Sequence, residues 1–97
     1  MAQYIMLADW TDQGIRNVKD SPSRLDAAKQ QWKKHGAEIT AFYMTMGSHD
    51  MVVIVEAPND EAVAKIALAL GSAGNVRTQT LKAFGEAEYR KIIQTLA

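Results

Sequence analysis

The spacing of apolar side chains along this chain switches between the two-residue period of strands and the longer period of helices. A first strand is predicted over 4–10, with apolar groups on both of its faces. One face holds Tyr4, Met6, Ala8 and Trp10, and the other holds Ile5, Leu7 and Asp9. A break at 11–14 is followed by Ile15 and Val18 at helical spacing, which predicts a short helical turn before Asp20.

The pair Ser21-Pro22 predicts the start of the first long helix. A Ser side chain can cap free backbone amides, and Pro at the first helical position lacks an N–H that would have no partner there. Leu25, Ala28 and Trp32 then recur on one face. Gly36 is expected to end this helix, because glycine adopts the left-handed cap conformation without strain.

The centre of the chain consists of two apolar runs joined at Gly47-Ser48-His49-Asp50, and we expect a tight hairpin there. The strand before the hairpin is predicted over 38–46, again with two apolar faces. One face would carry Phe42, Met44 and Met46, and the other Ile39, Ala41 and Tyr43. The strand after it, 51–55, has no polar alternation, which is typical of a central strand buried on both faces.

The second half of the chain repeats the pattern of helix and strand. Asn59 is expected to cap a helix over about 60–69, and residues 71–75 are expected to form the turn that ends it. The Thr-rich segment 76–84 predicts a polar edge strand, and a last helix is expected to open after Gly85. The buried face of the first of these helices would hold Val63, Ile66, Ala67 and Leu70, and the last helix carries Tyr89, Ile92, Ile93 and Leu96.

The order β-α-β-β-α-β followed by a terminal helix predicts an α+β fold, a ferredoxin-like domain with an antiparallel sheet. We expect one domain over residues 1–97, since a chain of this length buries roughly two-thirds of its unfolded surface. Right-handed crossovers place the first and third strands in the centre. Two helices cover one face of a sheet, yet three strands carry apolar groups on both. We therefore expect a second copy to cover the other face, as a sheet-on-sheet homodimer.

Composition limits the classes of binding partner and the cellular compartment that we expect. Basic and acidic residues number 11 each, so no excess charge attracts nucleic acid or an acidic membrane. The chain has no Cys and two His, and we expect neither a metal nor another cofactor. No apolar run approaches about 18 residues, and the N-terminus lacks the basic start of a signal peptide. These features predict a cytoplasmic protein.

Several separated blocks of the chain resemble one known family over nearly the whole length. They include Trp10-Thr11-Asp12-Gln13-Gly14, Val18-Lys19-Asp20-Ser21-Pro22, Val53-Ile54-Val55-Glu56-Ala57-Pro58 and Gly74-Asn75-Val76-Arg77-Thr78. These blocks, in this order, resemble the GYD family of small bacterial proteins. The resemblance implies a dimeric α/β barrel built from two ferredoxin-like domains, with no agreed activity.

The GYD family takes its name from a Gly, a Tyr and an Asp around the central hairpin. Here the corresponding stretch is Gly47-Ser48-His49-Asp50, so His49 stands where the family usually has Tyr. A role that depends on a phenol is therefore not expected to carry over to this chain.

His49 and Asp50 are the candidate catalytic residues. A histidine near a carboxylate can titrate close to neutral pH and serve as an acid, a base or a ligand. The structural alternative is that Asp50 bonds backbone amides of the turn while His49 is a half-exposed loop residue. Neighbouring residues of an extended segment also point to opposite faces, so the two side chains need not meet.

A small-ligand pocket is the second candidate site. Its candidate residues are Trp10, Gln13, Tyr43, His49 and Asp50, placed in the cleft between helices and sheet. The alternative for the segment 10–13 is a packed Trp followed by a helix cap.

Three arginines provide a further option for binding. Arg16, Arg24 and Arg77 can hold an anion through two parallel hydrogen bonds, or they can be solvated or paired with surface acids.

Two classes of function follow from these patterns. The first is a small homo-oligomer that binds a small organic molecule, as a regulatory or accessory module. The alternative is a cofactor-independent enzyme, an oxygenase or isomerase of the dimeric α/β barrel kind, by fold analogy. A purely structural interaction protein is the third option. Convergence of Trp10, His49 and Asp50 on one enclosed cavity would keep the binding and enzyme hypotheses open.

Overall fold

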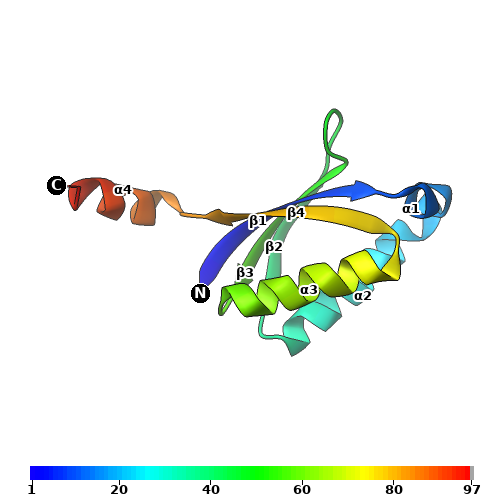
Figure 1. Cartoon of the computed structure of the whole chain (residues 1–97), viewed down its shortest axis with the longest axis horizontal. Coiled ribbons are helices and arrows are strands. Elements are labelled where there is room, and N and C mark those ends of the chain that lie inside the picture. The colour runs from blue at the N-terminus through cyan, green and yellow to red at the C-terminus, as the bar shows by residue number, and fades with distance from the viewer. Residues whose placement is uncertain (97) are drawn as a thin grey trace.

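A four-stranded antiparallel sheet is the frame of the molecule, and the computed structural model describes residues 1–96 (Figure 1). The strands are β1 (Ala2–Trp10), β2 (Glu38–Met44), β3 (Met51–Ala57) and β4 (Val76–Ala83). Their order across the sheet is β2-β3-β1-β4, and all neighbours pair antiparallel. The predicted ferredoxin-like topology is confirmed, with β1 and β3 central and the polar β4 at an edge.

Two long helices, α2 (Ser21–Lys34) and α3 (Asp60–Ala73), lie on the same face of the sheet (Figure 1). The predicted turn before α2 is present as α1 (Asp12–Arg16) and a 3-10 helix η1 (Val18–Asp20). Helices and sheet enclose one core, and burying each large apolar side chain there contributes about 1.5–3 kcal/mol. Its members include Tyr4, Met6, Trp32, Val53, Val55, Val63 and Ile66.

The start of α2 differs from the prediction by one residue. Ser21 is the first residue of the helix rather than its cap, and Asp20 at the cap position makes no side-chain capping bond. The reason is that η1 runs directly into α2, so the chain is already in a helical conformation at Asp20 and Ser21. The predicted end is confirmed, since α2 stops at Lys34 and Gly36 has a φ of 75°.

Helix α3 is longer than predicted. Asn59 caps it as expected, accepting a hydrogen bond of 2.9 Å from the amide of Ala62. The helix continues through Gly71 to Ala73, however, and ends at Gly74, which has a φ of 88°. A glycine inside a helix costs only about 1 kcal/mol relative to Ala, so Gly71 does not end it.

Strand β2 ends at Met44, two residues before its predicted end. Residues 45–50 form a loop rather than a tight turn, and Met46 is 95% exposed. The amide of Thr45 donates to the carbonyl of Asp50 at 2.7 Å, and the hydroxyl of Thr45 donates to the carbonyl of His49 at 2.7 Å. These two bonds fix the start of the loop at Thr45, so Met46 lies in the loop and not in the strand.

A β-bulge in β2 corrects the predicted faces of this strand. Ile39 pairs with Val55 and Ala41 pairs with Ile54, which leaves Thr40 as the extra residue. Strict alternation placed Ile39 and Phe42 on opposite faces. The bulge places both against the core under the helices.

The second face of the sheet is covered by no element among the described residues (Figure 1). We call it the open face. Strand β3 was predicted to be buried on both sides, but in the single chain its residues alternate between buried and half-buried. The apolar side chains of the open face, assigned from alternation and strand register, are Ile5, Leu7, Ala41, Tyr43, Val52, Ile54 and Leu81.

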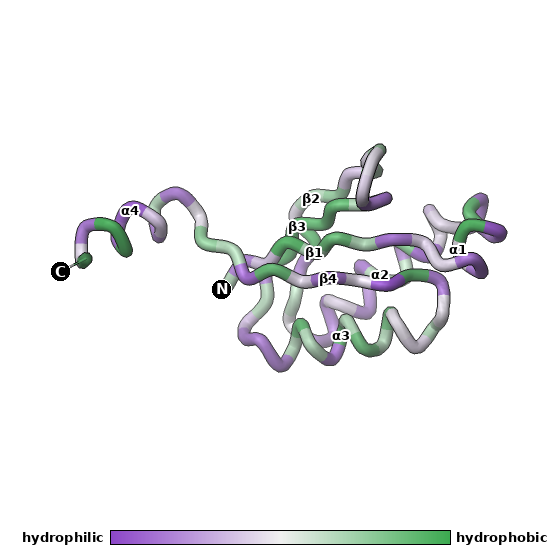
Figure 2. The backbone as a smooth tube through the Cα atoms, turned by 45° about the horizontal axis from the view of Figure 1, so that its top comes forward, coloured by the Kyte–Doolittle hydropathy of each residue, from purple (hydrophilic) through white to green (hydrophobic). Residues whose placement is uncertain are grey.

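The last helix, α4 (Glu86–Gln94), opens after Gly85 as predicted and extends away from the sheet (Figures 1 and 2). None of its residues is buried. The apolar side chains at and after this helix, all exposed, are Tyr89, Ile92, Ile93 and Leu96. No helix within residues 1–96 has both the length and the apolar character needed to cross a membrane.

Candidate functional site

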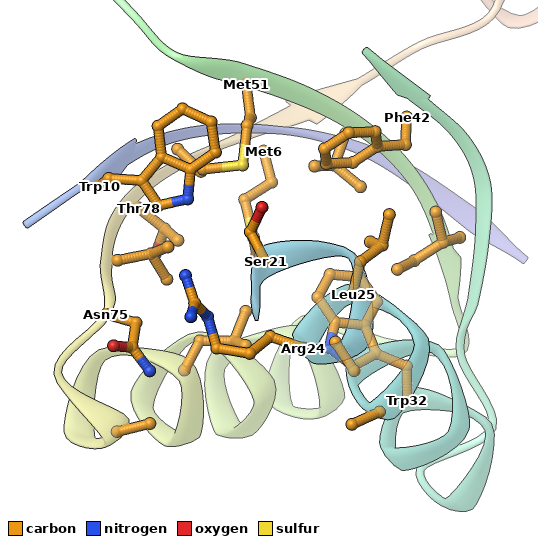
Figure 3. Close-up of a pocket in the computed structure, with 18 of the residues that line it drawn as sticks. Met6, Trp10, Ser21, Arg24, Leu25, Trp32, Phe42, Met51, Asn75 and Thr78 are labelled. Carbon is orange, nitrogen blue, oxygen red and sulfur yellow. The ribbon is translucent and has the colours of Figure 1, made fainter. Parts of the chain in front are cut away.

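A cavity of about 430 Å³ lies between the sheet and the helices α2 and α3 (Figure 3). This volume is within the usual range of small-ligand sites. The sheet contributes Met6, Trp10, Phe42, Met51 and Val53 to the walls, and the helices contribute Leu25, Ala28, Trp32, Ala69 and Leu70. Because most of these side chains are apolar, the cavity suits an apolar or largely apolar molecule.

The cavity exists because small residues stand where large ones would fill the space. Ala8 on β1, Ala28 on α2, and Ala69 and Ala73 on α3 all line it. Protein interiors otherwise pack closely, with few voids larger than a water molecule. The alanine-rich faces of both helices are therefore the sequence feature that opens the cavity.

One end of the cavity is polar. Arg24 enters there from the first turns of α2, and Figure 3 shows its guanidinium lying between Trp10 and Asn75. Its Nη1 donates to the carbonyl of Asn17 at 2.9 Å and its Nη2 donates to the carbonyl of Gly14 at 3.4 Å. These bonds hold the half-buried guanidinium in place. Among the described lining residues, Arg24 is the only one with a charge.

Helix α1 is bonded to the turn at residues 74–75, beside the polar end of the cavity. The hydroxyl of Thr11 accepts from the amide of Gly14 at 3.1 Å and donates to the carbonyl of Gly74 at 2.5 Å. Gln13 donates to Oδ1 of Asn75 at 3.1 Å. A Cβ on Gly14 would lie 1.9 Å from the carbonyl oxygen of Asn75, so the close approach admits only glycine. Gln13 thus holds the turn at 74–75 rather than lining the cavity.

His49 and Asp50 lie outside the cavity and have separate partners. The Nδ1 of His49 is 3.2 Å from Oδ2 of Asp9, and the amide of Asp50 donates to Oδ1 of Asp9 at 3.0 Å. The carboxylate of Asp50 accepts from the amide of Trp10 at 3.0 Å. Two aspartates therefore tie the 45–50 loop to the end of β1.

The five predicted ligand residues do not share one site. Trp10 lines the cavity, Gln13 bonds Asn75 after α3, and His49 and Asp50 bond the end of β1. Tyr43, which is 60% exposed, belongs to the open face because it pairs with Val52. A binding or catalytic role for His49 and Asp50 stays a prediction.

Sequence reasoning missed two features of these sites. Asp9 is the partner of His49, and its signal was its place as the one acid among the apolar residues of β1. Arg24 was named as an anion ligand but not placed in the cavity. Its signal was helical spacing, since Arg24, Ala28 and Trp32 follow one another at intervals of four and all three line the cavity.

A second polar cluster lies at the other end of β1. The buried Tyr4 hydroxyl donates to the carboxylate of Asp60 in the first turn of α3, and Nζ of Lys82 is 3.4 Å from the same carboxylate. The hydrogen bond to Asp60, together with burial, raises the pKa of Tyr4 to about 12. Hydrogen bonds from Tyr4 and then Lys82 lower the pKa of Asp60. The cluster anchors α3 to the sheet.

The lining of the cavity also bears on acid–base chemistry. A general acid or base must lie within hydrogen-bonding reach of the reacting group. Among the described lining residues there is no His, Asp, Glu, Lys or Tyr. In residues 1–96 no group of three His, Asp or Glu side chains is placed to share a metal ion.

Two comparisons with known proteins extend these observations. The profile of the GYD domain family matches residues 4–93. A protein of Thermus thermophilus, described as a glutamine synthetase and cystathionine beta-lyase binding protein, is similar over 89 residues with 34% identity. The aligned region covers 91% of this chain and 94% of that protein.

Proposed function

This chain belongs to the GYD domain family, and from that membership we propose that it is an accessory protein that acts by binding metabolic enzymes. The Thermus relative is named for its binding of glutamine synthetase and cystathionine beta-lyase. We take the corresponding enzymes of the same cell as the first partners to test. As expected from the sequence, this role would be carried out in the bacterial cytoplasm.

The observation that carries this proposal is the isolated position of α4. The helix has nine residues and none of them is buried. Helices shorter than about 12–15 residues are marginal in water by themselves, so packing against another surface would stabilise α4. Amphipathic helices commonly bind by laying their apolar face into a groove of a partner protein. We propose that the enzymes supply this groove.

Binding of purified glutamine synthetase and cystathionine beta-lyase to the immobilised chain, followed by interferometry, tests the proposal. The exposed side chains of Tyr89, Ile92, Ile93 and Leu96 form an apolar stripe at α4. The variant Ile92→Glu/Ile93→Glu places charges on this apolar stripe and should weaken binding at least tenfold. The matched control Gln94→Glu adds one charge on the opposite side of α4 and should bind as the wild type does. Absence of binding to both enzymes, or equal binding by the stripe variant, would contradict the role assigned to α4.

A homodimer is the second part of the proposal, and the open face supports it. Cross-strand pairs Ile5 with Ile54 and Leu7 with Val52 place four apolar side chains side by side on β1 and β3. Exposed apolar patches of this kind mark interaction sites, and two such sheets can pack face to face at about 10 Å. Light scattering should give twice the chain's mass of 10.7 kDa. A stable monomer at micromolar concentration would rule the dimer out.

Binding of a small organic molecule is a second candidate function, and the cavity of about 430 Å³ favours it. An accessory protein with such a site can report the level of a metabolite to the enzyme that it binds. The enzyme alternative has less support, because His49 and Asp50 lie outside the cavity and Asp50 already accepts from Trp10. An activity that His49→Ala abolishes would restore that alternative.

A further inference from the structure

We infer that the cavity takes a small carboxylate with an apolar body, and that Arg24 binds its carboxylate group. The inference rests on the proposal that this cavity binds a small molecule, and it names the chemical class. It does not depend on the partner enzymes or on the dimer.

The charge of Arg24 points to an anion. The ion pairs found within residues 1–96 are His49 with Asp9, Lys82 with Asp60, and Arg90 with Glu86, so none of them neutralises Arg24. Its two bonds are to neutral backbone carbonyls, of Asn17 and Gly14. A guanidinium has five N–H donors, and those not used by these carbonyls remain for a ligand. Carboxylates fit this group through two parallel hydrogen bonds.

The polar neighbours of Arg24 also offer donors. Oδ1 of Asn75 already accepts from Gln13, so its amide Nδ2 is the part left to bind a ligand. Figure 3 shows Asn75 beside the guanidinium and Ser21 directed toward the cavity. No described acid lines this end to repel an anion. Asn75 and Ser21 can therefore supply further donors to a ligand held by Arg24.

The remainder of the cavity suits an apolar body. Away from Arg24 the lining includes Met6, Met51, Phe42 and Leu25. Methionine side chains adapt to irregular apolar shapes, which favours a flexible chain or a ring over a polar metabolite. A ligand with its charge at one end and apolar groups at the other matches both parts of the cavity.

The chain carries its own reporter for this test. It has two tryptophans, Trp10 and Trp32, and both line the cavity. Titration with decanoate, below the concentration at which it forms micelles, should change their fluorescence in a saturable manner. The neutral 1-decanol and the cationic decylammonium have the same apolar chain, and both should bind at least tenfold more weakly, because neither can form charge-assisted hydrogen bonds with the guanidinium through a carboxylate.

Three variants separate the outcomes. Arg24→Gln should weaken decanoate binding about tenfold or more and leave 1-decanol within twofold. Arg16→Gln, an exposed arginine of α1, should change neither. Ala69→Phe fills the cavity and should remove the response to both probes, while circular dichroism checks that each variant is folded.

Different results would contradict the carboxylate assignment and the small-molecule proposal. Equal binding of decanoate and 1-decanol to the wild type, or of decanoate to wild type and Arg24→Gln, would overturn the carboxylate assignment and leave small-molecule binding intact. Unchanged binding to Ala69→Phe would place the probes elsewhere, for example on the open face. No saturable response to any probe would remove both the carboxylate assignment and the small-molecule proposal.

Discussion

The two faces of the sheet are built from the same kinds of side chain and lie in different environments. On β3, Val53 and Val55 are 7% and 0% exposed under the helices, whereas Val52 and Ile54 on the open face are only half-buried. Both sets are equally apolar. The difference teaches that the apolar character of a strand face does not show whether the same chain covers that face.

Neighbouring residues of β1 provide the strongest test of this difference. Met6→Ala removes a side chain that is 1% exposed, and should cost about 2–5 kcal/mol of unfolding free energy at any protein concentration. Leu7→Ala changes the open face. If a second copy covers this face, the midpoint of wild-type unfolding should rise with protein concentration, since dimer stability is linked to concentration, and a Leu7→Ala chain that is left monomeric should lack this rise. Urea unfolding of wild type and both variants at two concentrations a hundredfold apart makes the measurement. A wild-type midpoint that does not change with concentration would argue against the dimer.

A charge on the open face should act on assembly more than on folding. Ile54→Lys places an ammonium in the middle of the proposed sheet-on-sheet contact, and a buried unpaired charge there is costly. We expect the molar mass by light scattering to fall from the dimer to the monomer, with an unchanged circular dichroism spectrum. Gln30→Lys, on the exposed side of α2, is the matched control and should keep the wild-type mass. A dimer that survives Ile54→Lys would have to use another surface.

The smallest effect on stability is expected at Tyr4, a residue of the covered face whose hydroxyl bonds Asp60. Tyr4→Phe removes the hydrogen bond to Asp60 and should cost about 1 kcal/mol near neutral pH. Because folding raises the pKa of Tyr4 to about 12, its stabilising contribution is complete below pH 10 and is lost as the pH rises toward 12. Urea unfolding at pH 7, 9 and 11 should therefore show wild type and variant converging at alkaline pH.

Acid acts on the other partner of this bond. The pKa of Asp60 is lowered in the folded chain, so its contribution is present above the ordinary pKa of an aspartate and is lost as the pH falls through the lowered value. Tyr89→Phe, on the exposed α4, is the control and should follow the wild type at every pH. A Tyr4→Phe curve parallel to the wild type across the whole range would show that the bond does not contribute.

Local patterns predicted most of the fold. The two-residue period marked β1, an unbroken apolar run marked β3, Asn59 marked the start of α3, and Gly36 marked the end of α2. Each of these signals acts within a few residues, because capping and strand alternation are properties of the local backbone. The strand order then followed from the handedness of the connections.

The candidate site was predicted less well. Trp10 and Arg24 were named and line the cavity, but Gln13, Tyr43, His49 and Asp50, which were predicted to share a pocket with Trp10, do not line it. The bulge at Thr40 and the bonds of Asp9 to His49 and Asp50 depend on contacts between distant segments. Contacts between distant segments leave no periodic pattern in the sequence from which they could be predicted.

The sequence by itself determined the order of the helices and strands and the apolar character of their faces, since these properties depend on neighbours along the chain. Tertiary structure alone decided that small residues from β1, α2 and α3 leave a cavity, and that Arg24 lies at its polar end. It also decided that the bulge at Thr40 brings Ile39 and Phe42 to the same face of β2. Packing depends on the side chains that meet in space, and these come from segments up to about sixty residues apart, as Gln13 and Asn75 show.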